Sequence, residues 1–233
     1  MTVIWERLAD SVFRCRLPFL DVSVGLVYGR DTAVLVDTGT TPTEARAIAE
    51  DVDEMADRRV SHTMLTHNHF DHVLGASAFG EAEIYCPPKL HNDGRAHRPS
   101  ARRRITVRRH RRRGGPSDCR AVRIRATGQD ALIDLGDRTV SISHPGRGHT
   151  VHDLIAVVTG SDRPVVFCGD LVEGSGDPSV DADADLLAWP ATLERVVESG
   201  GEGGENAVFV PGHGAVVDAA FIRRQREWLR TQM

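Results

Sequence analysis

Three histidines and one aspartate fall within six consecutive residues, 67 to 72, in the pattern H-x-H-x-D-H. Imidazole nitrogens and carboxylate oxygens are the ligands that suit zinc and similar divalent metals. In an extended backbone alternate side chains share a face, so His67 and His69 can bind one ion. After the following turn, Asp71 and His72 can bind a second ion nearby. The run therefore predicts a site for divalent metal ions.

Three further residues of the same types follow apolar segments that read as strands. His149 comes after a turn rich in proline and glycine, Asp170 closes the segment Val165–Cys168, and His213 follows Ala207–Val210. We expect each at the C-terminal end of a strand, beside a glycine that lets backbone pass close. Taken singly, each is a weak signal, because a Gly-His or Gly-Asp pair usually marks only a turn. Their recurrence favours a metal site over a chance cluster of histidines on a solvated loop.

The same motifs resemble those of the metallo-β-lactamase superfamily. The matching segments are Val36-Asp37-Thr38-Gly39, the H-x-H-x-D-H run, Gly146-Arg147-Gly148-His149-Thr150, Phe167-Cys168-Gly169-Asp170 and Pro211-Gly212-His213-Gly214. Their order and rough spacing agree with the family from about residue 20 to residue 214. The resemblance implies an α/β fold, a four-layer αββα sandwich with metals at one edge between two sheets. We expect residues 1–233 to form one such domain.

The resemblance also implies a role for each candidate ligand. The seven ligands would be His67, His69 and His149 for the first ion, Asp71, His72 and His213 for the second, and Asp170 as the bridge between them. We expect two divalent metal ions, with zinc favoured over iron and manganese. Asp37 would support the ligands from behind, and Asp153 lies where such proteins often keep another polar support.

The chemistry that this site would perform is hydrolysis. Two divalent ions that share a water lower its pKa toward neutrality and polarise the electrophile. Asp71 would be the catalytic residue, which orients the attacking hydroxide and carries its proton toward the leaving group. We expect an ester, thioester or lactone of a small molecule as substrate, because β-lactamases of the superfamily usually lack an acidic residue at the position of Asp170. Some relatives use a single iron and a similar ligand set, so a mononuclear-iron oxidative member is an alternative.

Composition limits the remaining choices. A chain of 233 residues can form one α/β domain with a substantial core. Hydrophobic residues make up 40%, without an apolar run of the ~18 residues that a membrane span needs. The first residues do not resemble a signal peptide, and the four cysteines are scattered, which indicates neither a disulfide framework nor a cysteine-zinc site. We therefore expect a cytoplasmic protein with a small-molecule substrate, and the oligomeric state stays open.

Residues 91–130 differ from the rest of the chain. They hold 13 arginines and three acidic residues, a net charge of +10, so the remainder carries −14 within the total of −4. The segment shows no apolar periodicity. As a basic arm for a polyanion it would make nucleic-acid processing or binding the alternative function. A disordered insertion is the other structural interpretation, and we rank it above the basic arm. The single lysine among 29 basic residues indicates GC-rich coding DNA, and a frame excursion is the interpretation we favour.

The candidate ligands need strands and helices to position them. Strands are predicted at Val22–Tyr28, Ala33–Val36, Val60–Thr66, Glu83–Tyr85, Ala131–Asp134, Thr139–His144, Leu154–Thr159, Val165–Cys168 and Ala207–Val210. Helices are predicted at Pro42–Met55, Pro190–Glu198 and Val216–Arg230, with a short one from Val73 to Phe79. Thr40 or Thr41 would cap the first helix, with Pro42 in its first turn. Strands followed by helices in both halves suit sheets at the centre with helices outside.

Overall fold

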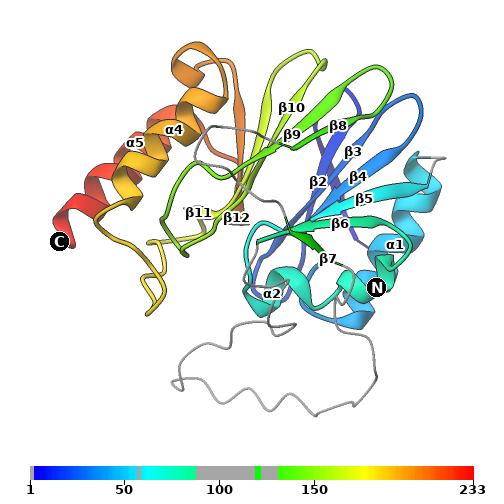
Figure 1. Cartoon of the computed structure of the whole chain (residues 1–233), viewed down its shortest axis with the longest axis horizontal. Coiled ribbons are helices and arrows are strands. Elements are labelled where there is room, and N and C mark those ends of the chain that lie inside the picture. The colour runs from blue at the N-terminus through cyan, green and yellow to red at the C-terminus, as the bar shows by residue number, and fades with distance from the viewer. Residues whose placement is uncertain (1–2, 57–58, 88–118, 122–130) are drawn as a thin grey trace.

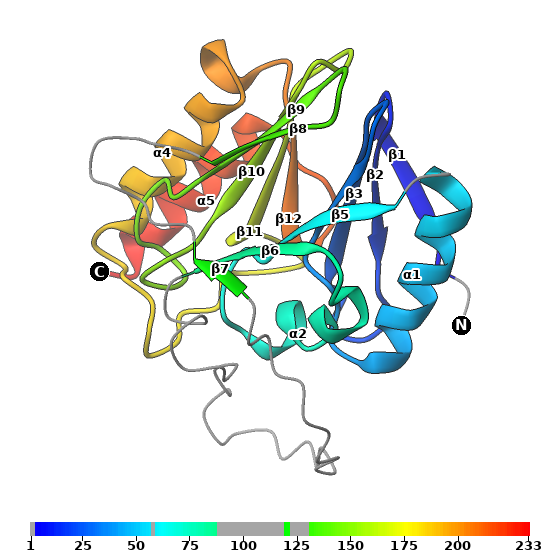
Figure 2. The same cartoon turned by 45° about the vertical axis from the view of Figure 1, so that its right-hand side comes forward.

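The computed structural model describes residues 3–56, 59–87, 119–121 and 131–233. Nearly all of the arginine-rich segment 91–130 lies outside these residues, so its three interpretations stay open. The described strands form two sheets, one of seven strands in chain order and one of five. Helices lie on the outer face of each sheet, and the sheets face one another (Figure 1 and Figure 2). This is the αββα sandwich expected from the resemblance.

The seven-stranded sheet is antiparallel in its first half and parallel in its second. Its strands are β1 (Trp5–Ala9), β2 (Val12–Arg16), β3 (Ser23–Tyr28), β4 (Ala33–Val36), β5 (Val60–Met64), β6 (Glu83–Cys86) and β7 (Cys119–Ala121). The strands from β1 to β4 pair antiparallel, and those from β4 to β7 pair parallel. The parallel half directs the C-terminal end of β5 toward the H-x-H-x-D-H run.

The five-stranded sheet has the order β12-β11-β10-β9-β8. Its strands are β8 (Ala131–Asp134), β9 (Thr139–Ser143), β10 (Ile155–Thr159), β11 (Val165–Gly174) and β12 (Val208–Gly214). Only β11 and β12 run parallel. The β9–β10 loop, β11 and β12 each bring one predicted ligand to the same end of the sandwich.

The helices cover the outer faces of both sheets. They are α1 (Pro42–Ala56), α2 (Phe70–Val73), α4 (Trp189–Ser199) and α5 (Ala219–Thr231), with short 3₁₀ helices η1 (Ala76–Phe79) and η2 (Glu202–Gly204). One apolar cluster fills the space between the sheets, a second lies under α1, and a third lies under α4 and α5. Three apolar layers therefore hold the four layers of structure together.

Helix α1 begins at a capping box formed by Thr41, one of the two predicted caps, and Glu44. Thr41 Oγ1 accepts a hydrogen bond from Glu44 N at 3.1 Å, and Glu44 Oε2 accepts one from Thr41 N at 2.9 Å. The two side chains thus satisfy amides that a helix start leaves without partners. The helix begins at the predicted Pro42 and ends one residue beyond the predicted Met55.

The predicted elements differ from the structure in several places. Strands β1 and β2 were not predicted, because both mix charged residues into short apolar patterns. Strand β7 was not predicted either, because it is only 3 residues long and lies in the arginine-rich segment. The single helix predicted from Val73 to Phe79 is wrong: α2 and η1 stand there, separated at Gly75. A Cβ at Gly75 would lie 1.9 Å from the Thr38 carbonyl oxygen, so the chain is packed too closely there for a side chain. Strands β11 and β12 run on to Gly174 and Gly214, so Asp170 and His213 lie within strands rather than after their ends.

Two findings concern membranes and cysteines. Within the described residues, no helix is both long and apolar enough to cross a membrane. Cys15 and Cys168 are buried free thiols, whereas Cys86 is disulfide-bonded. We expected no disulfide, because the four cysteines are scattered along the sequence. This expectation is wrong for Cys86.

Candidate metal centre

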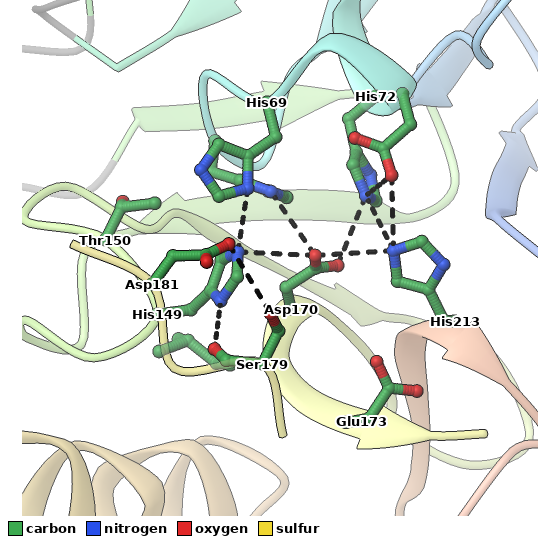
Figure 3. A network of polar contacts seen from close by, with 12 residues as sticks. His69, His72, His149, Thr150, Asp170, Glu173, Ser179, Asp181 and His213 are labelled. Carbon is green, nitrogen blue, oxygen red and sulfur yellow. Dashed lines mark hydrogen bonds and ion pairs between the residues drawn. The ribbon is translucent and has the colours of Figure 1, made fainter. Parts of the chain in front are cut away.

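The structure brings all seven predicted ligands together at one end of the sandwich. Figure 3 labels five of them: His69, His72, His149, Asp170 and His213. The segment that follows β5 carries His67 and His69, and helix α2 carries Asp71 and His72. The β9–β10 loop carries His149, β11 carries Asp170, and β12 carries His213. Both sheets therefore contribute, and the site exists only when they face one another.

Four of the seven side chains form a first group: His67, His69, His149 and Asp170. Its ligand atoms lie within 4.8 Å of one another. His149 Nε2 is 2.9 Å from His69 Nδ1 and 3.4 Å from Asp170 Oδ2. His67 Nε2 is 3.5 Å from the same carboxylate oxygen. Three imidazole nitrogens therefore surround one point beside Asp170.

The other three form a second group: Asp71, His72 and His213. His213 Nε2 is 3.5 Å from Asp71 Oδ2 and 3.4 Å from His72 Nε2. Asp170 faces this group too, with Oδ1 3.2 Å from His72 Nε2 and Oδ2 3.3 Å from His213 Nε2. Its carboxylate thus lies between the two groups.

The ring nitrogens that point away from the site are held by acceptors. His72 Nδ1 lies 2.8 Å from Asp37 Oδ2, and His213 Nδ1 lies 2.7 Å from the Leu20 carbonyl oxygen. His149 Nδ1 lies 3.2 Å from the Ser179 carbonyl oxygen. A carboxylate or carbonyl can only accept, so each of these Nδ1 atoms donates its hydrogen. The lone pair on Nε2 is then directed inward, as metal ligation requires.

Asp37 holds one histidine of each group in place, His72 directly and His67 through Thr66. Its carboxylate accepts hydrogen bonds from Thr66 N and Thr66 Oγ1, each at 2.8 Å, besides the one from His72. Because Thr66 Oγ1 donates to Asp37, its remaining contact with His67 Nδ1 at 3.0 Å places the hydrogen on that ring nitrogen. Asp37 has φ +60°, a strained conformation for a residue with a side chain. The surrounding structure keeps Asp37 in this strained conformation, and in it one carboxylate fixes the orientation of His67 and His72.

Comparisons with known proteins agree with this architecture. The family model of the metallo-beta-lactamase superfamily matches residues 17–222. The chain belongs to this superfamily. It is 25% identical over 202 residues to the metallo-beta-lactamase type 2 of Bacillus cereus, a match that covers 84% of this chain and 68% of that protein. It is 30% identical over 135 residues to a protein named "Probable metallo-hydrolase Rv2300c" of Mycobacterium tuberculosis. That match covers 54% of this chain and only 42% of the mycobacterial protein.

Solved structures of the superfamily show the same fold. The FIM-1 metallo-beta-lactamase from Pseudomonas aeruginosa, in its mono-zinc form, superposes with a TM-score of 0.74 at 19% identity, and the match covers 100% of this chain and 96% of that one. A metallo-beta-lactamase from Pontibacter korlensis has the same TM-score at 18% identity, with 99% and 100% coverage. At such identities the likeness concerns the fold alone. The family match and the sequence relatives make the chain a metal-dependent hydrolase of the metallo-beta-lactamase superfamily.

The donor set fits the divalent metals of the superfamily. His69 Nδ1 and His149 Nε2 face one another at 2.9 Å, and two lone pairs at that distance repel unless a proton or a metal cation lies between them. His67 Nε2 and Asp170 Oδ1 are buried polar atoms that make no hydrogen bond. Buried polar atoms without hydrogen bonds are costly, and a shared cation would satisfy both. Five imidazoles and two carboxylates are ligands that zinc accepts.

The metal-free electrostatics differ between the two groups. Burial holds the pKa of His67 and of His149 below the ordinary value, so these rings are neutral. Burial also opposes protonation of His213, but Asp170 outweighs it and raises the pKa of His213 to about 9. The pKa of His72 is likewise held well above its ordinary value, because Asp170, Asp37 and Asp71 outweigh burial. Without metal, the second group therefore carries protons that the first group lacks.

The second polar support implied by the resemblance, Asp153, lies in the loop that carries His149. Its buried carboxylate accepts hydrogen bonds from Thr150 N at 2.9 Å and Thr150 Oγ1 at 2.8 Å. Burial raises the pKa of Asp153 to about 8, although the Thr150 donors oppose the shift. His144 Nδ1 lies 2.7 Å from the Asp153 carbonyl oxygen. The loop is thus ordered by its own polar residues.

From the sequence, the run of residues 181–185 between β11 and α4 reads as a solvated loop that could border the mouth of the site, but the contacts of individual residues there are not predictable. Trp189 packs its ring edge-on to His149 at a centroid distance of 5.8 Å, and its Nε1 donates to the Leu171 carbonyl at 3.0 Å. Asp183 Oδ2 lies 3.3 Å from His69 Nε2. Asp183 belongs to an alternating Asp-Ala run that reads as a solvated loop, and nothing in that pattern distinguishes it from its neighbours.

Proposed function

We propose that the protein is a dinuclear hydrolase that acts on an ester, thioester or lactone of a small molecule. The observation that carries the proposal is the place of Asp170. One carboxylate faces His67 and His149 at 3.5 and 3.4 Å and also faces His72 and His213 at 3.2 and 3.3 Å. A carboxylate in this position suits a bridge between two ions. Zinc is the metal we favour, because imidazole dominates the donor set.

Two divalent ions bound there would supply a nucleophile at neutral pH and polarise the substrate carbonyl. The protein's own residues fix where that chemistry takes place. His67, His69 and His149 would hold one ion, and His72 and His213 would hold the other with Asp71. The carboxylate of Asp71 would also orient the nucleophile and accept its proton, then return it to the leaving group. Asp37 would keep the rings of His67 and His72 from turning.

The substrate class rests on the acidic residue at position 170. The β-lactamases that this superfamily is named for usually lack an acidic bridge there, so lactam hydrolysis is not the activity we propose. Esters, thioesters and lactones share a carbonyl carbon open to hydrolytic attack and a leaving oxygen or sulfur. Such substrates fit a site that stabilises a developing oxyanion and returns one proton.

A panel of chromogenic esters, thioesters and lactones tests the proposal, with a cephalosporin as the lactam comparison. The protein is stripped of metal and reloaded separately with zinc, manganese or iron(II). We expect zinc to restore turnover of at least one ester, thioester or lactone. The control is Asp53→Asn, which alters an exposed carboxylate on α1 and should match the parent. Turnover of the cephalosporin alone would contradict the substrate class.

The mononuclear-iron alternative makes a different prediction for the same samples. An oxidative member would consume oxygen only when loaded with iron and would keep one ion per chain. We expect no oxygen uptake with any metal. The nucleic-acid alternative depends on residues 91–130, which lie almost entirely outside the residues that the structure describes. The cytoplasmic location also stays a prediction.

A further inference from the structure

The loop between β11 and α4, residues 175–188, lies against the first group of ligands (Figure 3). It contributes two acceptors to outward-facing ring nitrogens. The Ser179 carbonyl oxygen lies 3.2 Å from His149 Nδ1, and Asp183 Oδ2 lies 3.3 Å from His69 Nε2. The first contact uses backbone and can be supplied by many residues. The second uses a carboxylate, so it depends on the residue type at position 183.

His69 is oriented differently from the other four histidines of the site. The other four turn Nε2 inward and hold Nδ1 against an acceptor, whereas His69 turns Nδ1 inward, 2.9 Å from His149 Nε2. In the metal-free protein the lone pair of His149 Nε2 would draw the ring hydrogen of His69 to Nδ1, because the two nitrogens lie only 2.9 Å apart. The hydrogen of His69 must therefore be kept on Nε2 by something outside the ring.

We propose that Asp183 is a positioning residue that holds His69 in the tautomer with Nε2 protonated, so that Nδ1 is free to bind the first metal ion. The inference rests on the proposed function only in taking His69 as a ligand. The Asp183 and His69 side chains are only 11% and 13% exposed, so water competes little for the contact. The position of Asp183 is fixed in turn, because backbone hydrogen bonds of the neighbouring Asp185 hold the loop in place. Asp185 N donates to the Gly148 carbonyl oxygen at 2.8 Å, and Trp189 N donates to the Asp185 carbonyl oxygen at 2.9 Å.

Two variants separate hydrogen bonding from charge. Asp183→Asn keeps a carbonyl oxygen that can accept from His69 Nε2 but removes the charge, whereas Asp183→Ala removes both. Asp177→Asn is the matched control, because Asp177 is an exposed aspartate on the same loop and its loss changes the net charge equally. Thermal unfolding of each metal-free variant reports whether the fold is intact.

The first measurement is the tautomer of His69 in the metal-free protein, read from the ring nitrogen shifts of ¹⁵N-histidine-labelled samples. We expect the parent and Asp177→Asn to show Nε2 protonated. Asp183→Asn should keep that tautomer, and Asp183→Ala should lose it or show a mixture. A parent-like tautomer in Asp183→Ala would overturn the inference.

The second measurement is the zinc dissociation constant of the tighter site, obtained by competition with a chelating dye. Removal of a residue that orients a ligand typically weakens metal binding by about 10–100-fold. We expect that loss for Asp183→Ala, a smaller loss for Asp183→Asn and none for Asp177→Asn. Equal weakening by Asp177→Asn would show a general charge effect and overturn positioning. Failure of the parent itself to bind zinc would instead contradict the proposed function, while the tautomer would still test this inference.

Discussion

At the scale of single residues, the site separates the predicted ligands from the groups that orient them. Each imidazole has one nitrogen directed inward and one held by an acceptor, and those acceptors include a carboxylate on a strained backbone and two carbonyl oxygens. Asp71 differs from the histidines, because a carboxylate can bind an ion and also accept a proton. Its substitution should therefore separate ligation from proton transfer.

The variant Asp71→Asn keeps the size of the side chain and one oxygen ligand but removes the charge and the proton acceptor. The first group of ligands is untouched, so the variant should fold and keep at least one metal ion. Loss of a positioned acid–base group typically costs about 10²–10⁴-fold in rate. We expect kcat to fall by at least ~10²-fold on any ester or lactone that the parent hydrolyses. Near-parental turnover, with metal content confirmed, would disprove the role of Asp71, and Asp53→Asn is the control.

The pKa of His213 predicts how the metal-free protein responds to pH. A histidine whose folded pKa is raised to about 9 stabilises the fold fully below its unfolded pKa of about 6.5 and loses that contribution as the pH rises toward 9. Metal-free stability in urea should therefore fall across this window. His213→Gln should remove this part of the decline, and an unchanged decline in that variant would show that another group is responsible.

Zinc binding should show the opposite trend at the second group. An ion there must displace protons from His213 and His72, whereas the neutral rings of His67 and His149 release none. Calorimetric titration at several pH values should show one step with little pH dependence and a second that tightens as the pH rises. The second step should release protons to buffer. Two steps with equal proton release would contradict this assignment.

At the scale of elements, the parallel pair β11 and β12 sets the distance between the two groups. Gly212 on β12 packs against Asp170 on β11 so closely that an added Cβ would lie 1.8 Å from Asp170 Oδ1. The same Cβ would lie 2.9 Å from the backbone carbonyl carbon of Gly169, so β11 must shift slightly in addition to the Asp170 carboxylate. A single methyl group on a residue that is not a ligand should therefore displace the bridge.

The variant Gly212→Ala should fold but bind the second ion poorly, because Asp170 must turn away from its place between the groups. We expect metal content to fall toward one ion per chain and esterase activity to fall with it. Gly176→Ala is the control, since a Cβ there meets nothing within 4 Å. Parental metal content in a folded Gly212→Ala would show that the close approach does not matter.

The sequence predicts strands and helices well where one signal dominates. β4 and β8 have the predicted bounds, and α1 starts at the predicted proline because the cap and the proline agree. It predicts poorly where tertiary pairing decides. β1 and β2 form at the edge of a sheet despite their charges, and β11 continues beyond Cys168 because β12 pairs with it as far as Gly174.

The site shows the same division. The ligands are recognisable because their residue types and spacing carry the chemistry. Asp183 is not recognisable, because its role comes from a loop that folds back onto a histidine 114 residues earlier. The carbonyl oxygens of Leu20 and Ser179 leave no trace in the sequence at all, because any residue provides one.

At the scale of the whole molecule, the candidate metal centre depends on both sheets at once. The seven-stranded sheet positions the H-x-H-x-D-H run, and the five-stranded sheet positions the other three ligands. The apolar cluster between the sheets holds the two halves of the site together. Binding two ions that only the folded state can hold should in turn stabilise the protein by mass action.

The central claim is that Asp170 joins two metal ions in one site. Native mass spectrometry of the metal-free chain titrated with zinc counts the ions bound per chain directly. We predict two ions for the parent and one for a folded Asp170→Ala variant, with Asp53→Asn binding two. One ion in the parent, with the same number in Asp170→Ala, would contradict the bridged dinuclear centre.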